Sequence, residues 1–471
     1  MRTRTTEGAM RVWTSLLLVL GGAAFSAGGQ FSDEERARIV QFWNEPGRYS
    51  VSAPPDAAQR GPWTVRLSVA ASQWLWNYDR ARGLAKGPPT QNSAPANPEQ
   101  KEWDAWIEAK LNWDRWTAAQ AAHEANNRVL GRSAAFDSPI PQVPGPAPLG
   151  LIALAGNPPH FADVVAPLFH SVRFDERMTI SYPDNPLLRA RYAYYRFPQG
   201  VMSGGSRVRE LPAEFVDALF TEAGVSASEK KVMAAVSLLE GGFDSVNTYD
   251  TGFVSVGFIQ FACLKDGAGS LGAVLRRHKQ EAPESFQSDF RTYGIDVAEN
   301  ATMSVVDPST GAELSGAVAA LKIIDDKRLI AVFQRAGKLS KAFRMAQIRV
   351  AKAMYYPADS AVTFQSGGKT VTGPISAFIK SEAGMATLMD RKVNTGNVEP
   401  LPIVVALIAA ENGIQKVEDL APFERDIVAA MKFRKDYLAD SSLTQPGPAR
   451  RPQRDYGSLA RHQQSRRGRG G

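Results

Sequence analysis

One short stretch, residues 237–261, constrains the fold and chemistry of this chain more than any other. It reads SLLEGGFDSVNTYDTGFVSVGFIQF and contains one glutamate, Glu240. Upstream, Ser226 and Glu229 have the spacing of a capping box, and apolar residues then recur at helical intervals. Two glycines follow Glu240 directly, which is typical of a helix end. The sequence therefore predicts a helix that begins after Ser226 and has Glu240 as its last residue.

The residues after Glu240 predict a small β-hairpin. Glycine, asparagine, threonine and aspartate suit turns, and the apolar residues that follow suit short strands: Phe253, Val254, Val256, Phe258 and Ile259. At the end of a buried helix face, beside Leu238, Leu239 and Phe243, this carboxyl group loses hydration, so we expect its pKa to be raised. A raised pKa suits a general acid near neutral pH.

Other residue types offer no chemistry that competes with Glu240. A cluster of His160, His170, Asp175 and Glu176 matches no zinc-binding spacing, so we expect neither a metal nor a cofactor. The chain has one cysteine, Cys263, so it cannot form an intramolecular disulfide. We expect Cys263 to be a buried thiol rather than a nucleophile.

The net charge of +7 belongs to the ends of the chain. Residues 441–471 carry seven arginines against one aspartate, and residues 1–27 carry three arginines against one glutamate. The remainder is therefore near neutral, which is not the charge of a folded nucleic-acid-binding surface, and we expect no nucleic-acid partner. The basic tail is suited to association with an anionic envelope polymer or lipid, although a solvated tail without a fixed partner explains it equally well.

Residues 1–27 have the pattern of a secretory signal peptide. Three arginines precede an apolar run at 12–25, and small residues follow. The run is shorter than the ~20 residues that span a bilayer, so we favour a cleaved signal over an uncleaved membrane anchor. The expected location is secreted, or in the periplasm or cell envelope.

Composition divides the rest of the chain into four parts. We expect a helical, tryptophan-rich N-terminal region at 28–135, a Pro/Gly-rich connecting region at 136–205, a catalytic domain at 206–440 and a disordered basic tail at 441–471. In the first part, four tryptophans lie near one face of a predicted helix: Trp103, Trp106, Trp113 and Trp116. Such rings can stack on sugars, but we favour packing in a core.

A glutamate at a helix end, a turn-rich hairpin and the segment from Gly257 to Gln260 together resemble the lysozyme superfamily, particularly goose-type lysozymes and lytic transglycosylases. Gly257 and Gln260 match a Gly-Leu-Met-Gln-like segment of that family, with Phe258 and Ile259 at its apolar positions. The resemblance spans roughly residues 210–400 and is specific only over 237–261. The expected fold is mainly α: a lysozyme-like helical domain with a small β-hairpin at the active site, plus a helical N-terminal region.

The resemblance implies that Glu240 is the general acid/base that protonates the leaving glycosidic oxygen, and that Ser255 and Gln260 line the sugar cleft. Tyr355, near the end of a helix predicted at 339–356, is a further candidate for the cleft wall. Either Asp244 or Asp250 is placed to be a second carboxylate. We favour Asp250 as a water-activating base, because the hairpin sets it farther from Glu240 and inverting enzymes separate their carboxyl groups by roughly 6.5–9.5 Å.

The chain departs from the family directly after the acid, where lytic transglycosylases carry a serine and this chain has Gly241. This departure leaves hydrolysis and transglycosylation both open. The sequence thus predicts a secreted glycosidase that cleaves the peptidoglycan glycan backbone. Two alternatives remain: a chitosanase or chitinase-like hydrolase of a related amino-sugar polymer, and a non-catalytic cell-envelope binding protein.

Overall fold

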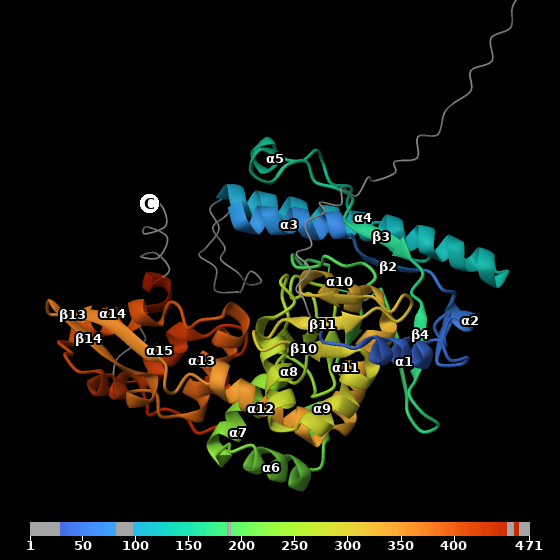
Figure 1. The fold of residues 1–471 in the computed structure, drawn as a ribbon. Coiled ribbons are helices and arrows are strands. Elements are labelled where there is room, and N and C mark those ends of the chain that lie inside the picture. Colours follow the sequence, from blue (N-terminus) through green and yellow to red (C-terminus); the bar gives the residue numbers. More distant parts are fainter. Residues whose placement is uncertain (1–28, 82–97, 186–187, 189, 450–455, 461–471) are drawn as a thin grey trace, which may run out of the picture.

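A computed structural model describes residues 29–81, 98–185, 188, 190–449 and 456–460 (Figure 1). The predicted signal peptide at 1–27 lies outside the described residues. The structure is 50% helix and 14% strand, and the strands of its described residues form five small antiparallel sheets. The prediction of a mainly α fold is therefore wrong, and the fold is mixed α/β. Strands of two to six residues leave little alternation for sequence reasoning to detect.

The N-terminal residues are divided between two hydrophobic cores. Helix α1 (Asp33–Trp43) buries Trp43 in the larger core. After it, β1 (Tyr49–Ser52) pairs with β4 (Phe169–Arg173), which pairs with β5 (Thr179–Pro183). Helix α2 (Ala57–Arg60) follows β1. The predicted N-terminal and connecting regions thus share one sheet, so they are interleaved in space.

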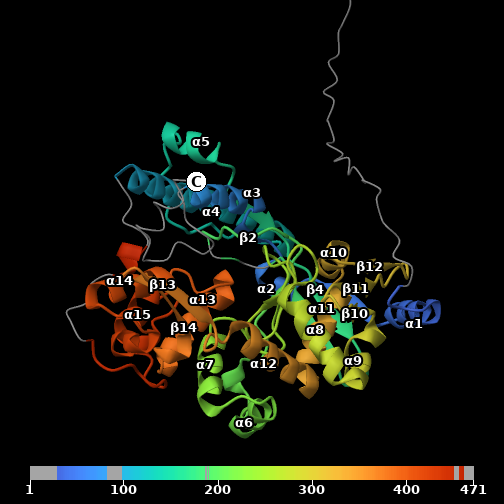
Figure 2. The same ribbon diagram turned by 60° about the vertical axis from the view of Figure 1, so that its left-hand side comes forward.

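A smaller core lies between two long helices. It contains side chains from α3 (Val69–Ala81), α4 (Pro98–Leu130) and α5 (Leu149–Ala155), next to the strand pair β2 (Thr64–Leu67) and β3 (Ala162–Val165). In Figures 1 and 2, α3 and α4 lie side by side across the top of the molecule.

The tryptophans of α4 pack within the protein. Trp103 is buried in the smaller core. The indole N–H groups of Trp106 and Trp116 donate to the carbonyl oxygens of Gly145 (2.9 Å) and Ser138 (3.3 Å). The Pro/Gly-rich segment therefore runs back along α4 and contacts these rings.

The central part of the molecule surrounds the stretch that holds Glu240. Here α6 (Ala213–Glu222) and α7 (Ala227–Ser237) precede a sheet of very short strands in the order β6 (Met202–Ser203), β7 (Val246–Asn247), β8 (Ser255–Val256), β9 (Phe261–Ala262). The 3-10 helix η1 (Val208–Glu210) connects β6 to α6. The predicted hairpin is thus part of a four-stranded sheet, because the chain before η1 adds a strand to its edge.

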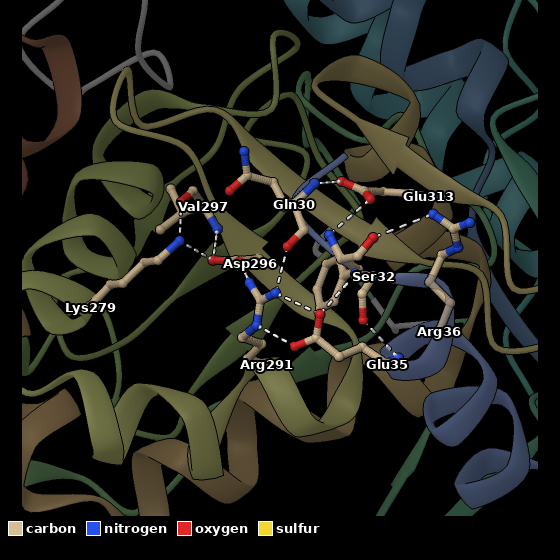
Figure 3. A network of polar contacts seen from close by, with 10 residues as sticks. Gln30, Ser32, Glu35, Arg36, Lys279, Arg291, Asp296, Val297 and Glu313 are labelled. Atoms are coloured by element: carbon tan, nitrogen blue, oxygen red, sulfur yellow. Dashed lines mark hydrogen bonds and ion pairs between the residues drawn. The ribbon is translucent and has the colours of Figure 1, made fainter. Parts of the chain in front are cut away.

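Further helices complete the larger core: α8 (Gly269–Glu281), α9 (Pro283–Asp289), α10 (Ala317–Asp325), α11 (Lys327–Leu339) and α12 (Lys341–Tyr355). Between α9 and α10 lie η2 (Arg291–Tyr293) and a sheet in the order β10 (Ile295–Val297), β11 (Met303–Val306), β12 (Glu313–Ser315). A polar network joins this part to the residues around α1 (Figure 3). In it, Arg291 binds Glu35 and Asp296, and the Glu313 carboxylate accepts from the backbone N–H groups of Gln30 and Phe31.

The residues from β13 onward gather on one side of the molecule (Figures 1 and 2). They form the hairpin β13 (Ala361–Ser366) and β14 (Lys369–Pro374), then η3 (Ile375–Ala377), α13 (Glu382–Thr395), α14 (Leu401–Asn412), η4 (Val417–Phe423), α15 (Glu424–Met431) and η5 (Tyr437–Ala439). Helix α13 packs against α7. None of the described helices combines the length and apolar character needed to cross a membrane.

The sequence predicts disorder from Ser441, but described residues beyond this point are packed. Leu443, Tyr456 and Ala460 belong to the larger core, with exposed fractions of 4%, 8% and 0%. Thr444 N–H donates to Glu382 Oε2 at 2.8 Å. Apolar side chains spaced through this polar segment give it a packed face. Its arginine-rich parts at 450–455 and 461–471 lie outside the described residues.

Candidate functional site

Glu240 lies in a turn just beyond α7, and not at the last helical position as the sequence predicts. The helix ends at Ser237, whose carbonyl oxygen accepts from the backbone N–H groups of Glu240 (3.0 Å) and Gly241 (3.1 Å). Leu238 and Leu239 are 38% and 41% exposed. The expectation that these leucines dehydrate Glu240 is therefore wrong, because they face solvent beside it.

Residues from the C-terminal part of the chain bury the Glu240 carboxylate instead. Its side chain is 11% exposed, and Oε1 lies 2.5 Å from Arg434 Nη2. The amide of Asn394 on α13 also lowers the pKa of this carboxyl group. Burial raises the pKa of Glu240 above its ordinary value, and the Arg434 guanidinium partly opposes that effect.

Arg434 also binds Asp390, which is fully buried on α13. Arg434 Nε donates to Asp390 Oδ1 at 2.9 Å. Sequence reasoning missed Arg434 because it lies 194 positions from Glu240 and belongs to no motif. The sequence around Arg434 shows only a phenylalanine and basic residues directly after α15. This pattern does not indicate a contact with Glu240.

Tyr355, predicted for the cleft wall, does lie near Glu240. Burial raises the pKa of Tyr355, and the negative charge of Glu240 raises it further. Its ring centroid is 6.3 Å from that of Phe261. The structure therefore places Asp390, Asn394 and Tyr355 at Glu240, and the residue that sequence reasoning did not consider is Arg434.

Asp250 has a different set of contacts from Glu240. Its Oδ2 accepts from the Tyr192 hydroxyl and its Oδ1 from the Gly252 N–H, each at 2.9 Å. Asp250 also forms a β-bridge with Tyr195. Burial raises the pKa of Asp250. Oδ1 thus fixes the turn itself, and Oδ2 holds this turn against the segment that contains Tyr192.

Gln260 and Ser255 brace the central sheet. Gln260 has φ 55°, and its amide donates to Ser245 Oγ at 2.5 Å and accepts from the Asn247 amide at 2.6 Å. Ser255 lies in β8 opposite Asn247 and is 7% exposed. The polar atoms of Gln260 therefore make hydrogen bonds within the sheet and do not point away from it toward a sugar.

Gln347 ties the Glu240 stretch to the segment that begins at Gly257. Fully buried on α12, it donates to Phe243 O at 3.0 Å and accepts from Phe258 N–H at 3.3 Å. Gly257 has φ 90°, and a Cβ there would lie 2.2 Å from Gln347 Oε1. The glycine of the predicted Gly-x-x-Gln pattern is thus required for the approach of Gln347.

Gly241 occupies the position where lytic transglycosylases carry serine. Its φ is 145°, and a Cβ would lie 2.7 Å from Cβ and Oγ of Ser245. A serine would be strained here, because L-residues rarely adopt this backbone conformation and the space is filled.

The other candidate aspartate, Asp244, is also buried, with an exposed fraction of 2%. Its Oδ1 accepts from Ser206 N–H at 2.7 Å. Its Oδ2 is buried and makes no hydrogen bond with the described residues. Asp244 therefore holds the loop before η1 against the turn that follows Glu240.

The residues considered for other chemistry have internal contacts. Cys263 is fully buried, as predicted, and burial raises the pKa of its thiol to about 12. His170 lies 2.7 Å from the Tyr49 hydroxyl and 3.1 Å from Asp184 Oδ2. Among the described residues, no group of three or more His, Cys, Asp or Glu side chains is arranged to hold a metal ion.

Comparisons of the chain with models of known protein families, with curated proteins and with solved structures found no match.

Proposed function

We propose that this protein is a secreted glycosidase that cleaves the glycan backbone of peptidoglycan, with Glu240 as its general acid and base. The environment of Glu240 is the observation that carries the proposal. Its carboxyl group is largely buried, its pKa is raised by that burial, and it lies in a turn beside two exposed leucines. A carboxyl group with a raised pKa, next to apolar surface, suits protonation of a glycosidic oxygen.

In the proposed reaction, protonated Glu240 donates its proton to the glycosidic oxygen while the bond from that oxygen to the anomeric carbon breaks. Glu240 then accepts a proton from the hydroxyl group that attacks the anomeric carbon. Attack by water gives a reducing end, and attack by a hydroxyl of the same sugar gives an anhydro sugar.

The contacts of Asp250 support a route that does not use this residue as the base. Tyr192 and Gly252 already donate to its two oxygens, so Asp250 is engaged in holding the turn. The N-acetyl group of the substrate can instead assist at the anomeric carbon, a route known among glycoside hydrolases. We therefore propose substrate assistance, with Asp250 stabilising the turn.

One observation favours a non-catalytic, envelope-binding protein as a second candidate. Asp250 and Gln260, two of the side chains expected to act on the sugar, use their polar atoms in hydrogen bonds within the protein. A protein that only binds the glycan would need no free carboxylate beside Glu240.

Incubation of the purified protein with peptidoglycan and with chitosan, followed by mass spectrometry of the products, tests the proposal. We expect cleavage of peptidoglycan, and a loss of about 100-fold or more in Glu240→Gln. Glu214→Gln, which changes an exposed glutamate of α6, is the matched control and should retain activity. Circular dichroism would verify that both variants fold.

The products separate the alternatives. Anhydro ends would show transglycosylation, and reducing ends would show hydrolysis. Turnover of chitosan alone would support the chitosanase alternative. Binding to peptidoglycan without turnover, equal in wild type and Glu240→Gln, would exclude an enzyme and support the binding protein.

A further inference from the structure

Glu240 shares one guanidinium group with a second carboxylate. Arg434 Nη2 lies 2.5 Å from Glu240 Oε1, and the same nitrogen contacts Asp390 Oδ1. Arg434 Nε also donates to Asp390 Oδ1 at 2.9 Å, and the backbone N–H of Arg434 reaches Asp390 Oδ2 at 3.4 Å. One positive charge therefore serves two carboxylates in a largely buried cluster.

Asp390 receives more donors than Glu240. Its side chain is 1% exposed, and it accepts from the Asn394 amide at 3.3 Å in addition to the three N–H groups of Arg434. Glu240 accepts from Arg434 Nη2. With both carboxylates charged, the cluster has a net charge of −1, which is unfavourable in a buried place. A proton that neutralises the cluster should go to the carboxylate with fewer donors, which is Glu240.

The other titratable groups at the cluster supply no positive charge. Tyr355 lies on α12 and Tyr437 on η5, and the negative charge of Glu240 raises the pKa of both hydroxyl groups. Tyr437 is 1% exposed, and its hydroxyl makes no hydrogen bond with the described residues. Arg434 is thus the cation with the largest effect on Glu240.

We propose that Asp390 is a positioning residue for the acid step. Because Asp390 pairs with Arg434, this cation stabilises the charged form of Glu240 less. Glu240 therefore keeps the proton that it donates as a general acid. The inference rests on the proposed function, because it concerns the acid role of Glu240. It goes further by assigning a purpose to a buried ion pair that the sequence does not connect with Glu240.

Titration of Glu240 in Asp390→Asn tests this inference without a substrate. In that variant Arg434 keeps Glu240 as its anionic partner, so Glu240 should lose its proton at a pH lower by about one unit or more. Arg434→Gln removes the cation and should shift the titration to higher pH. NMR of ¹³C-labelled glutamate carboxyl groups follows the titration, with Glu240→Gln to assign the signal.

The matched control is Arg425→Gln. Arg425 lies on α15, and its guanidinium donates to the carbonyl oxygens of Pro446 and Gly447, so its loss should leave the titration of Glu240 unchanged. Thermal unfolding would identify a variant that does not fold. If Asp390→Asn is such a variant, the double variant Asp390→Asn/Arg434→Gln, which leaves no unpaired buried charge, carries the test: Glu240 should titrate at a lower pH in it than in Arg434→Gln alone.

Activity measurements distinguish this inference from the proposed function. If both hold, the alkaline limb of the pH–activity profile moves with the Glu240 titration in each variant. Opposite titration shifts without turnover of any glycan would support the effect of Asp390 on Glu240 and refute the glycosidase. An unchanged titration of Glu240 in the folded variants would overturn the inference, whatever the activity.

Discussion

Gly242 lets the chain turn away from Glu240 in contact with the backbone of the preceding loop. Its N–H donates to Gly204 O at 3.0 Å, and it forms a β-bridge with Arg207. A Cβ on Gly242 would lie 1.9 Å from the carbonyl oxygen of Ser206. Backbone atoms cannot move aside as a flexible side chain can, so this position tolerates only glycine.

We therefore expect Gly242→Ala to lower the free energy of unfolding by about 3 kcal/mol, the upper part of the range for overpacking. Urea denaturation followed by circular dichroism measures the change. Gly204→Ala is the matched control in the same contact, because a Cβ there would meet no atom within 4 Å. Equal stability of the two variants would contradict the close approach of the two segments.

At this scale the sequence reveals Glu240 but not its partners. Glu240 is predictable because the capping box, the apolar spacing and the glycines all lie within a few residues of it. The contact between Glu240 and Arg434 is not predictable, since it depends on how the chain after α15 packs beside α13, and α13 itself packs against α7. Burial raises the pKa of Glu240, as predicted, but of the three expected apolar neighbours only Phe243 is buried, while Leu238 and Leu239 are exposed.

At the scale of elements, local signals located the helices better than the strands. The capping box of Ser226 and Glu229 is confirmed by reciprocal hydrogen bonds at the start of α7. The helix end is misplaced by three residues, because the turn at 238–240 keeps helix-like hydrogen bonds to Ser237. The hairpin β13–β14 is absent from the prediction, although β13 alternates buried and exposed residues and Gly367-Gly368 between the strands are typical of a hairpin turn.

Arg291 connects elements that are distant in sequence, as Figure 3 shows. Its guanidinium lies 2.9 Å from Glu35 in α1 and binds Asp296 in β10, whose side chain is 0% exposed. The hydrogen bond from Arg291 lowers the pKa of Glu35 to about 2. The ion pair thus fixes α1 against the sheet of β10 and β11.

We expect Arg291→Gln to destabilise the protein by about 3 kcal/mol, because it leaves Asp296 buried with one fewer cation. Chemical denaturation measures the loss, and hydrogen exchange should show that α1 opens first. Arg36→Gln is the control: its partner Asp33 is 91% exposed, so the cost should stay below about 1 kcal/mol. A similar small cost for Arg291→Gln would show that the network does not hold α1.

At the scale of the whole molecule, one core joins the two ends of the described chain. Phe31, Val172 and Leu443 all belong to the larger core, although composition assigns them to three separate regions. Composition detects where a chain is rich in proline, glycine or arginine, but not where a few apolar residues bury themselves. Tyr456 and Ala460 lie in the predicted tail and are nevertheless buried.

This core contains a histidine that makes global stability depend on pH. His278 is 1% exposed, and the rings of Phe286, Phe290 and Phe343 lie 5.6–5.8 Å from its ring. Burial lowers its pKa from 6.5 to about 4. The negative charges of Asp289 and Glu281 raise the pKa, but their effect is smaller than that of burial.

Between pH 6.5 and 4 the unfolded chain therefore binds a proton at His278 that the folded protein does not. Stability is fully present above pH 6.5 and falls as the pH is lowered toward 4, by roughly 3 kcal/mol in total. Urea denaturation at a series of pH values should show this slope in the wild type and a flatter one in His278→Gln, whose side chain does not titrate.

Glu35→Gln should keep the slope between pH 6.5 and 5, because the lowered pKa of Glu35 acts only below about pH 4.5. Identical slopes in the wild type and His278→Gln would mean that the folded core admits the protonated imidazole.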